Sequence, residues 1–270
     1  MSYLEALIIA IIEGLTEFLP VSSTGHMVLT SAIMGMQPTA FTKLFEIVIQ
    51  FAAILAVVVV YIKKFLNLRN MSFYVKLLIA CIPALAFGAV FKKHIDQMLE
   101  KPVIIAVIIL AGGIILVFID RFFKSPRIDS EEQITPKSSF IVGLFQVLSI
   151  IFPGLSRSAA TIIGGMTQGL TRRAAAEFSF FVAVPTMFAA SAKSLLDVYK
   201  ESPEVLSSGN LGVLLFGCLV SFIVAFVVVK FFIRFLEKHG FKVFGYYRII
   251  LGVVFLALCY AGIINAQFIS

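Results

Sequence analysis

Long apolar runs that are almost free of charge dominate this chain and constrain its fold more than any other feature. A helix needs about 20 apolar residues to cross a hydrocarbon core of about 30 Å. Six runs meet that length: about 44–65, 73–91, 102–120, 174–197, 211–233 and 246–267. Only 14% of the 270 residues are charged, against about 25% in soluble domains. The sequence therefore predicts an all-α, polytopic membrane bundle with six transmembrane helices.

Two further apolar segments are interrupted. Residues 3–36 and 138–170 each contain Pro, Gly and hydroxyl residues near their middle, and each half is too short to span alone. At membrane depth, such a break is tolerated only where protein or a water-filled cavity satisfies the freed backbone groups. We therefore predict that both segments are re-entrant helical hairpins that face each other inside the bundle.

The chain also repeats itself weakly. "GLTEFLPVSSTG" from Gly14 resembles "GLFQVLSIIFPGLSRSA" from Gly143, and "LFEIVIQFAAILA" parallels "AAEFSFFVAVPTM". This pattern divides a single membrane domain into a first repeat (1–120), a hydrophilic linker (121–137) and a second repeat (138–270). Each repeat has one hairpin and three spans. Because three is odd, the second repeat is predicted to insert upside down, with a functional site near the midplane where the halves meet.

Basic residues indicate the orientation. If the first hairpin opens outward, these lie on the cytoplasmic side: Lys63, Lys64, Arg69, Lys76, Arg121, Lys124, Arg127, Lys137, Arg172, Arg173, Arg234, Lys238, Lys242 and Arg248. Far fewer lie outside: Lys43, Lys92, Lys93, Lys101 and Lys200. Cytoplasmic loops are enriched in Lys and Arg, so both termini and the first hairpin's mouth are predicted to be external. The net charge of +7 indicates contact with anionic head groups and no nucleic acid.

The first hairpin concentrates polar side chains. Glu13 and Glu17 are four residues apart and share one helix face. Two buried carboxylates on one face repel each other unless a proton or a cation lies between them, which is how metal sites and general acid–base sites work. The alternative is that this helix lies in the membrane interface with both carboxylates in water.

The break that follows Pro20 carries the hydroxyl residues Ser22, Ser23 and Thr24. Ser22 is the better candidate for capping the next half-helix, and Ser23 is the better candidate for a free hydroxyl. His26 lies close enough to reach a hydroxyl at the break. The competing interpretation is that the hydroxyls only cap the helix and that His26 is a satisfied core residue.

The second hairpin places Arg157 between Ser156 and Ser158, with Thr161 one turn later. A guanidinium at a helix start flanked by hydroxyls is typical of phosphate binding. Alternatively, Arg157 is buried to pair with Glu13 or Glu17, which would also bring the hairpins together. Other residues are single candidates: Glu46, Gln50 and Glu177 as supporting polar groups or as ties between helices, and Phe18, Phe45 and Phe178 as the lining of a lipid groove.

Carboxylates, hydroxyls, a histidine and an arginine together indicate phosphoryl chemistry at the membrane. A hydroxyl attacks phosphorus, a carboxylate or histidine handles its proton, and the arginine stabilises the phosphoryl oxygens. A diphosphate would invite a divalent cation, Mg²⁺ or Ca²⁺, on Glu13 and Glu17. The main alternative is a secondary transporter, in which the glutamates and His26 relay protons, and a lipid flippase activity is also open.

The motifs "EGLTEFLPVSSTGH" and "PGLSRSAATIIGGM" resemble the signatures of bacterial undecaprenyl-diphosphatases of the bacitracin-resistance type, and the likeness extends over essentially the whole chain. It implies hydrolysis of a polyprenyl diphosphate lipid, undecaprenyl diphosphate, to undecaprenyl phosphate and inorganic phosphate at the outer face of the bacterial inner membrane, with a divalent cation. This reaction would recycle the carrier lipid for peptidoglycan synthesis and confer bacitracin resistance. A homodimer stays open.

The resemblance also implies roles for individual residues. Ser23 would be the nucleophile, Glu17 or His26 its base, and Arg157 the phosphate clamp, although attack by an activated water uses the same groups. The substrate-binding residues would be Ser22, Thr24, Ser156, Ser158 and Thr161, and the metal ligands Glu13 and Glu17.

Overall fold

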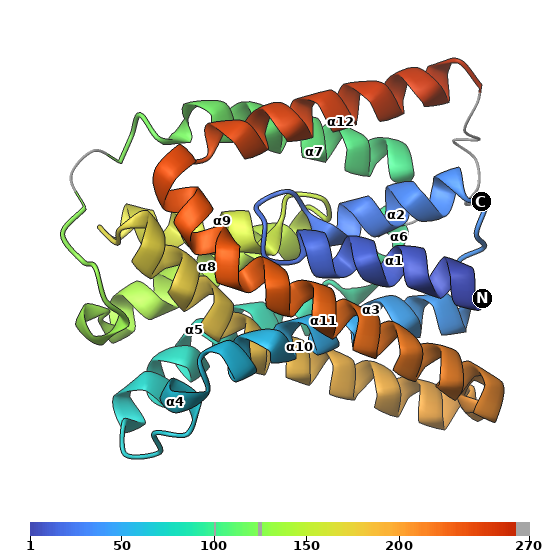
Figure 1. The fold of residues 1–270 in the computed structure, drawn as a ribbon, viewed down its shortest axis with the longest axis horizontal. Coiled ribbons are helices and arrows are strands. Elements are labelled where there is room, and N and C mark those ends of the chain that lie inside the picture. Colours follow the sequence, from blue (N-terminus) through green and yellow to red (C-terminus); the bar gives the residue numbers. More distant parts are fainter. Residues whose placement is uncertain (100, 124–125, 263–270) are drawn as a thin grey trace.

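A computed structural model describes residues 1–99, 101–123 and 126–262. In these ranges the chain forms helices joined by short loops, with no strand (Figure 1). The helices are α1 (Tyr3–Thr16), α2 (Ser23–Ile33), α3 (Ala40–Val60), α4 (Ile62–Phe65), α5 (Met71–Val90), α6 (Lys92–Leu99), α7 (Pro102–Ile119), α8 (Pro136–Ile151), α9 (Arg157–Thr167), α10 (Arg172–Glu201), α11 (Ser208–His239) and α12 (Lys242–Tyr260), with 3₁₀ turns η1 (Glu131–Gln133) and η2 (Pro203–Leu206).

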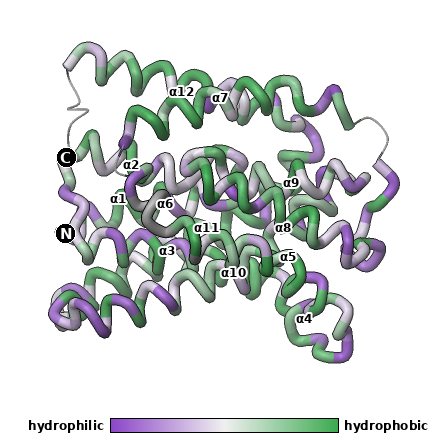
Figure 2. The backbone as a smooth tube through the Cα atoms, turned by 180° about the vertical axis from the view of Figure 1, so that it is seen from behind, coloured by the Kyte–Doolittle hydropathy of each residue, from purple (hydrophilic) through white to green (hydrophobic). Residues whose placement is uncertain are grey.

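Six helices are long and apolar enough to cross a membrane: α3, α5, α7, α10, α11 and α12. This confirms the prediction of a polytopic helical bundle. Hydrophobic residues run along the long helices, and hydrophilic residues are more frequent at the two ends of the bundle (Figure 2). Many large apolar side chains of these helices are exposed. The chain is therefore a multi-pass membrane protein.

The two interrupted segments form helical hairpins, α1–α2 and α8–α9. Their helices have 11 to 16 residues. At about 1.5 Å per residue, such helices reach at most about 24 Å, less than the hydrocarbon core. The hairpins enter from opposite ends of the bundle and meet at its centre (Figure 1). We call the end where α1 begins and α12 ends the terminal end, and the other, where η1 lies, the linker end.

The tips of the hairpins share an unusual backbone conformation. Among the described residues, Ser22 (φ 73°) and Ser156 (φ 80°) are the only non-glycine residues with positive φ. Each caps the helix that follows: Ser22 Oγ accepts from the N–H of Gly25, and Ser156 Oγ from the N–H of Ala159, both at 3.2 Å. A left-handed serine followed by a capped helix start recurs in both halves, which supports the proposed division into two repeats.

Helix packing follows the same pattern. α1 packs on α11 and α8 packs on α5, while α3 packs on α10 and α7 on α12. Gly14 and Gly143, which begin the two repeated motifs, are points of close approach. A Cβ at Gly14 would lie 2.7 Å from the carbonyl oxygen of Ser221, and one at Gly143 would lie 2.3 Å from that of Ala80.

Aromatic side chains fill the interior. Phe18 packs edge-to-face on Phe180 with ring centroids 4.9 Å apart, and Phe18, Phe45 and Phe178 are each no more than 1% exposed. The suggestion that these three phenylalanines line a lipid groove is therefore wrong. Burying a large aromatic side chain removes more apolar area from water than lining an open groove would.

The predicted linker lies across the linker end. Arg172 binds Asp120 through two nitrogens, at 2.6 and 2.8 Å, and Lys76 donates to the carbonyl oxygens of Glu131 and Glu132. Lys64 forms an ion pair with Glu131. These contacts attach the linker to α4 and α5, and the residue before it, Asp120, to α10.

Candidate active site

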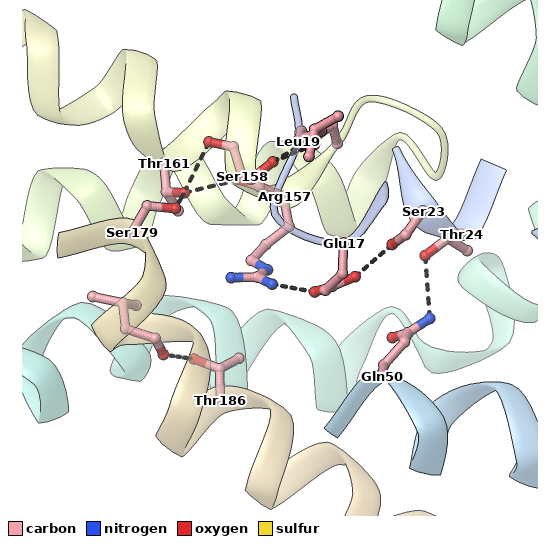
Figure 3. A network of polar contacts seen from close by, with 12 residues as sticks. Glu17, Leu19, Ser23, Thr24, Gln50, Arg157, Ser158, Thr161, Ser179 and Thr186 are labelled. Atoms are coloured by element: carbon pink, nitrogen blue, oxygen red, sulfur yellow. Dashed lines mark hydrogen bonds and ion pairs between the residues drawn. The ribbon is translucent and has the colours of Figure 1, made fainter. Parts of the chain in front are cut away.

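The hairpin tips meet through the carboxylate of Glu17, which follows the last turn of α1. Ser23, the first residue of α2, donates from Oγ to Glu17 Oε2 at 2.5 Å. Arg157, the first residue of α9, forms an ion pair through Nη2 with Glu17 Oε1 (Figure 3). One carboxylate thus joins a hydroxyl of its own hairpin to a guanidinium of the other.

The two serines at the first tip have different environments. Ser22 caps α2, as predicted, and Ser23 is left to bond Glu17. Beside them, Gln50 Nε2 lies 3.5 Å from Thr24 Oγ1, a long contact between α3 and α2. The charge-assisted bond to Glu17 makes Ser23 the hydroxyl that is best placed to lose its proton.

Glu13 lies one turn before Glu17 and is completely buried. In the described part of the chain, no donor group reaches either of its carboxylate oxygens; its carboxyl lies beside that of Glu17, and Arg157 and Glu46 are its other charged neighbours. This burial excludes the alternative in which α1 lies in the interface with its carboxylates in water. A buried carboxylate without a partner is costly, so Glu13 requires a proton or a cation.

The donor set around Glu13 fits a cation that is bound only partly by protein. Among the described residues, no three His, Cys, Asp or Glu side chains are grouped to hold a metal. Both oxygens of Glu17 already accept hydrogen bonds, from Ser23 and from Arg157. Mg²⁺ usually takes one or two carboxylates and completes its octahedron with water and other oxygen ligands, so Glu13, one turn from the pocket residue Glu17, supplies one carboxylate for it.

The three hydroxyl residues of the second hairpin that were predicted to bind substrate, Ser156, Ser158 and Thr161, all form hydrogen bonds within the protein. Ser158 Oγ donates to the carbonyl oxygen of Leu19 at 2.8 Å and so ties the two tips together. Thr161 Oγ1 donates to the carbonyl oxygen of Arg157 at 2.9 Å and lies within hydrogen-bond distance of Ser179 Oγ, at 2.6 Å (Figure 3). Ser156, which caps α9 and lies 3.1 Å from Ser158 Oγ, is the one of the three that also lines the pocket described below.

His26 points away from Ser23. Its Nδ1 lies 2.7 Å from the carbonyl oxygen of Ser22, which can only accept, so Nδ1 carries a proton. Its Nε2 lies 2.7 Å from the hydroxyl of Tyr247, and the two rings are stacked at 5.5 Å. Of the two predicted bases for Ser23, Glu17 therefore accepts its hydroxyl hydrogen bond, whereas His26 bonds Tyr247 instead.

A pocket of about 520 Å³ extends from the tips toward the terminal end. Its polar end is lined by Glu17, Ser23 and Arg157, and its longer part by apolar residues of α5, α8 and α10. Glu46 and Gln50 also line it, but Glu177 instead pairs with Arg173 at 3.2 Å, one turn away on α10. A polar end with apolar walls suits a lipid that carries an anionic head group.

Sequence reasoning missed three residues near the tips. Gln146 lines the pocket, donates to Thr186 at 3.3 Å, and has a buried Oε1 with no partner among the described residues. It occupies in the second motif the place of Glu17 in the first, so the repeat could have revealed it. Tyr247 and Arg248 lie on α12. Counting Arg248 among the cytoplasmic loop charges was wrong, because its side chain is completely buried.

Comparison with known proteins gives consistent matches over nearly the whole chain. Residues 6–254 match a protein family described as "Bacitracin resistance protein BacA". The chain is 52% identical over 258 residues to an undecaprenyl-diphosphatase of Flavobacterium psychrophilum, covering 96% of each chain. It is 46% identical over 264 residues to one of Bdellovibrio bacteriovorus, covering 97% of this chain and 98% of that one. It is 45% identical over 279 residues to one of Porphyromonas gingivalis, covering 97% and 99%.

Proposed function

We propose that this chain, which belongs to the BacA family of bacitracin resistance proteins, is an undecaprenyl-diphosphatase that hydrolyses undecaprenyl diphosphate to undecaprenyl phosphate and inorganic phosphate. The observation that carries the proposal is the carboxylate of Glu17, bonded to Ser23 and to Arg157 at the polar end of an apolar pocket. These parts suit phosphoryl transfer, and the relatives' names favour a hydrolase over the transporter alternative.

Ser23 and Glu17 supply the nucleophile and its base in this proposal. Ser23 Oγ forms a bond to the terminal phosphorus as its proton passes to Glu17. The bond from that phosphorus to the bridging oxygen breaks, and undecaprenyl phosphate leaves. Water then cleaves the seryl phosphate and releases inorganic phosphate. A water activated by Glu17 could attack the same phosphorus directly, with the same residues around it.

Arg157 is assigned to the phosphoryl oxygens. Its Nη2 binds Glu17, but its Nη1 is buried and has no hydrogen-bond partner among the described residues. A buried N–H donor without a partner is costly, and a phosphate oxygen would remove that cost. A guanidinium that already faces the reaction site needs little reorganisation when negative charge develops there.

Glu13, with Glu17 beside it, is the proposed protein ligand of a divalent cation, Mg²⁺ or Ca²⁺. Such a cation would neutralise charge on the diphosphate oxygens when bound. What this chain supplies is a buried carboxylate that lacks any other partner in the described structure.

We assign the protein to the bacterial inner membrane, with the site open to the outer side. The pocket is lined by Pro38, Lys193 and Asp197 toward the terminal end of the bundle, whereas Arg172 and the linker lie at the other end. Basic residues concentrate at the linker end, which supports a cytoplasmic position for that end.

Phosphate release in detergent tests the proposal. Purified protein with undecaprenyl diphosphate and Mg²⁺ or Ca²⁺ is expected to release one phosphate per lipid, and a chelator is expected to stop the reaction. A transporter moves a solute across a membrane and breaks no phosphate bond, so it would release no inorganic phosphate in detergent. Absence of phosphate with every divalent cation tried would overturn the enzyme assignment. Because the pocket walls are apolar, inorganic diphosphate is expected to be a much poorer substrate.

A further inference from the structure

Arg248 in α12 is a completely buried arginine whose hydrogen bonds all go to backbone carbonyl oxygens. Its Nε donates to Ile109 at 3.0 Å. Its Nη1 donates to Pro20 at 3.2 Å and to Leu155 at 2.9 Å. Its Nη2 donates to Gly154 at 3.0 Å and to Ile108 at 3.4 Å. The five N–H donors of the guanidinium thus meet five carbonyls, none of them a carboxylate.

Three of these carbonyls belong to the breaks between half-helices. Pro20 lies in the tip of the first hairpin, and Gly154 and Leu155 lie in the tip of the second. A broken helix leaves carbonyl groups without helical partners, and at membrane depth each unsatisfied group costs several kcal/mol. The single nitrogen Nη1 touches one carbonyl from each hairpin. Arg248 therefore connects the tips directly and anchors both to α7.

The surrounding helix is shaped to admit this side chain. A Cβ placed on Gly112 of α7 would lie 2.2 Å from Arg248 Nη2 and 2.8 Å from its Cζ. Gly112 therefore leaves the space that the guanidinium occupies. Arg248 is not among the described residues that line the pocket, so its side chain does not contact the space where the substrate would lie.

We propose that Arg248 is a positioning residue, which holds the two hairpin tips in the register that brings Ser23 and Arg157 onto Glu17. Ser23, where α2 begins, lies three residues after Pro20, and Arg157, where α9 begins, lies two residues after Leu155. Fixing these carbonyls to one rigid guanidinium fixes the start of α2 relative to the start of α9. A displacement of about 1 Å at a reacting group can cost about 100-fold in rate. The catalytic part of this inference rests on the proposed function, but the positioning of the tips does not.

Two substitutions test the proposal without relying on a single variant. Arg248→Met removes the donors and keeps an apolar side chain of similar reach. Gly112→Ala leaves Arg248 in the sequence but places a methyl group where its guanidinium lies. The matched controls are Arg234→Met, which makes the same change at an exposed position of α11, and Gly209→Ala, where a Cβ would meet nothing within 4 Å. Arg248→Lys keeps the charge but not the fork of donors.

Hydrogen exchange of the intact protein in detergent reports on positioning without any activity. In Arg248→Met and Gly112→Ala, amides of residues 18–23 and 153–159 are expected to exchange faster than in wild type, while those of α10 and α11 stay unchanged. Both controls should match wild type. Unchanged exchange at both tips in folded Arg248→Met would overturn the proposal, and so would acceleration that spreads evenly over all helices.

Kinetics on undecaprenyl diphosphate complete the test. In both variants kcat is expected to fall by about 100-fold, with KM within about threefold of wild type, because the apolar part of the pocket on α5, α8 and α10 is unchanged. Arg248→Lys is expected to lie between Met and wild type, whereas full activity with Lys would show that charge alone matters and would contradict positioning. If the wild type releases no phosphate but the tips still loosen in the variants, the proposed function fails while the positioning of the tips stands.

Discussion

At the scale of single residues, the candidate active site depends on the groups that bind the carboxylate of Glu17. Its two oxygens are taken by Ser23 and Arg157, and Glu13 beside it is left without a partner in the described structure. A buried carboxylate is stable only with compensation. Ser23 and Arg157 provide that compensation for Glu17, whereas Glu13 requires a proton or a cation from solution. This difference supports Glu17 as the base and Glu13 as the cation ligand.

Ser23→Ala tests the covalent route. Loss of the nucleophile is expected to lower kcat by about 10³-fold, within the range of groups that act directly in the transition state. Stopped assays of phosphate release from undecaprenyl diphosphate would measure the change. Ser149→Ala, which removes another hydroxyl from the pocket wall, is the control and should keep near-normal turnover. Near-normal turnover by Ser23→Ala would leave direct attack by water as the better mechanism.

Glu13→Gln tests the cation site with a readout that does not need activity. Ligands that bind only the folded protein raise its melting temperature, so Mg²⁺ is expected to stabilise the wild type. The neutral amide costs less to bury, so the variant should melt at a higher temperature than wild type without cation and show little further rise with Mg²⁺. Equal Mg²⁺-dependent shifts in wild type and variant would place the cation elsewhere.

At the scale of elements, hydropathy predicted which segments cross the membrane better than where each helix ends. The span predicted at 211–233 is observed as Ser208–His239, because α11 continues past its apolar run with Arg234 and Lys238. A helix is held by backbone hydrogen bonds, which can continue beyond the point where the side chains stop being apolar. The short helix α6 was missed because it has no apolar run. The end of the span predicted at 246–267 lies partly outside the described residues.

The glycine that begins the second motif gives a prediction at this scale. In Gly143→Ala the new Cβ would lie 2.3 Å from the carbonyl oxygen of Ala80, so α8 must move away from α5. We expect a loss of about 1–3 kcal/mol in stability, typical of overpacking. At about 2–4 °C per kcal/mol for a chain of this size, thermal melting in detergent would detect it. Gly209→Ala, with open space around its Cβ, should not lower the melting temperature.

At the scale of the whole molecule, the sequence predicted the convergence of the hairpins but not what holds them. An arginine and a pair of glutamates in apolar segments must find partners, so charge alone indicated that Arg157 would reach the first hairpin. Arg248 has no such signature, since its acceptors are backbone carbonyls that every residue carries. Its position inside the predicted span 246–267 was the available signal. The direction in which His26 points depends on Tyr247, which is distant in sequence and was not predictable.

Membrane orientation can be tested by labelling from one side of the membrane. In a background with Cys81, Cys218 and Cys259 replaced by alanine, Glu204→Cys lies at the terminal end and Asp129→Cys at the linker end, both exposed. In right-side-out vesicles, an impermeant maleimide is expected to label position 204 at once and position 129 only after detergent. The reverse pattern would place the pocket mouth on the cytoplasmic side.

A double-mutant cycle between the hairpins tests the central claim most directly. Phosphate release is measured in detergent for Ser23→Ala, Arg157→Ala and the double variant. If both residues act on one phosphorus, each single variant loses most of the activity, and the double variant falls no more than about tenfold below the worse single one. Losses that multiply, as for residues in independent sites, would contradict a shared site at the meeting point of the two tips.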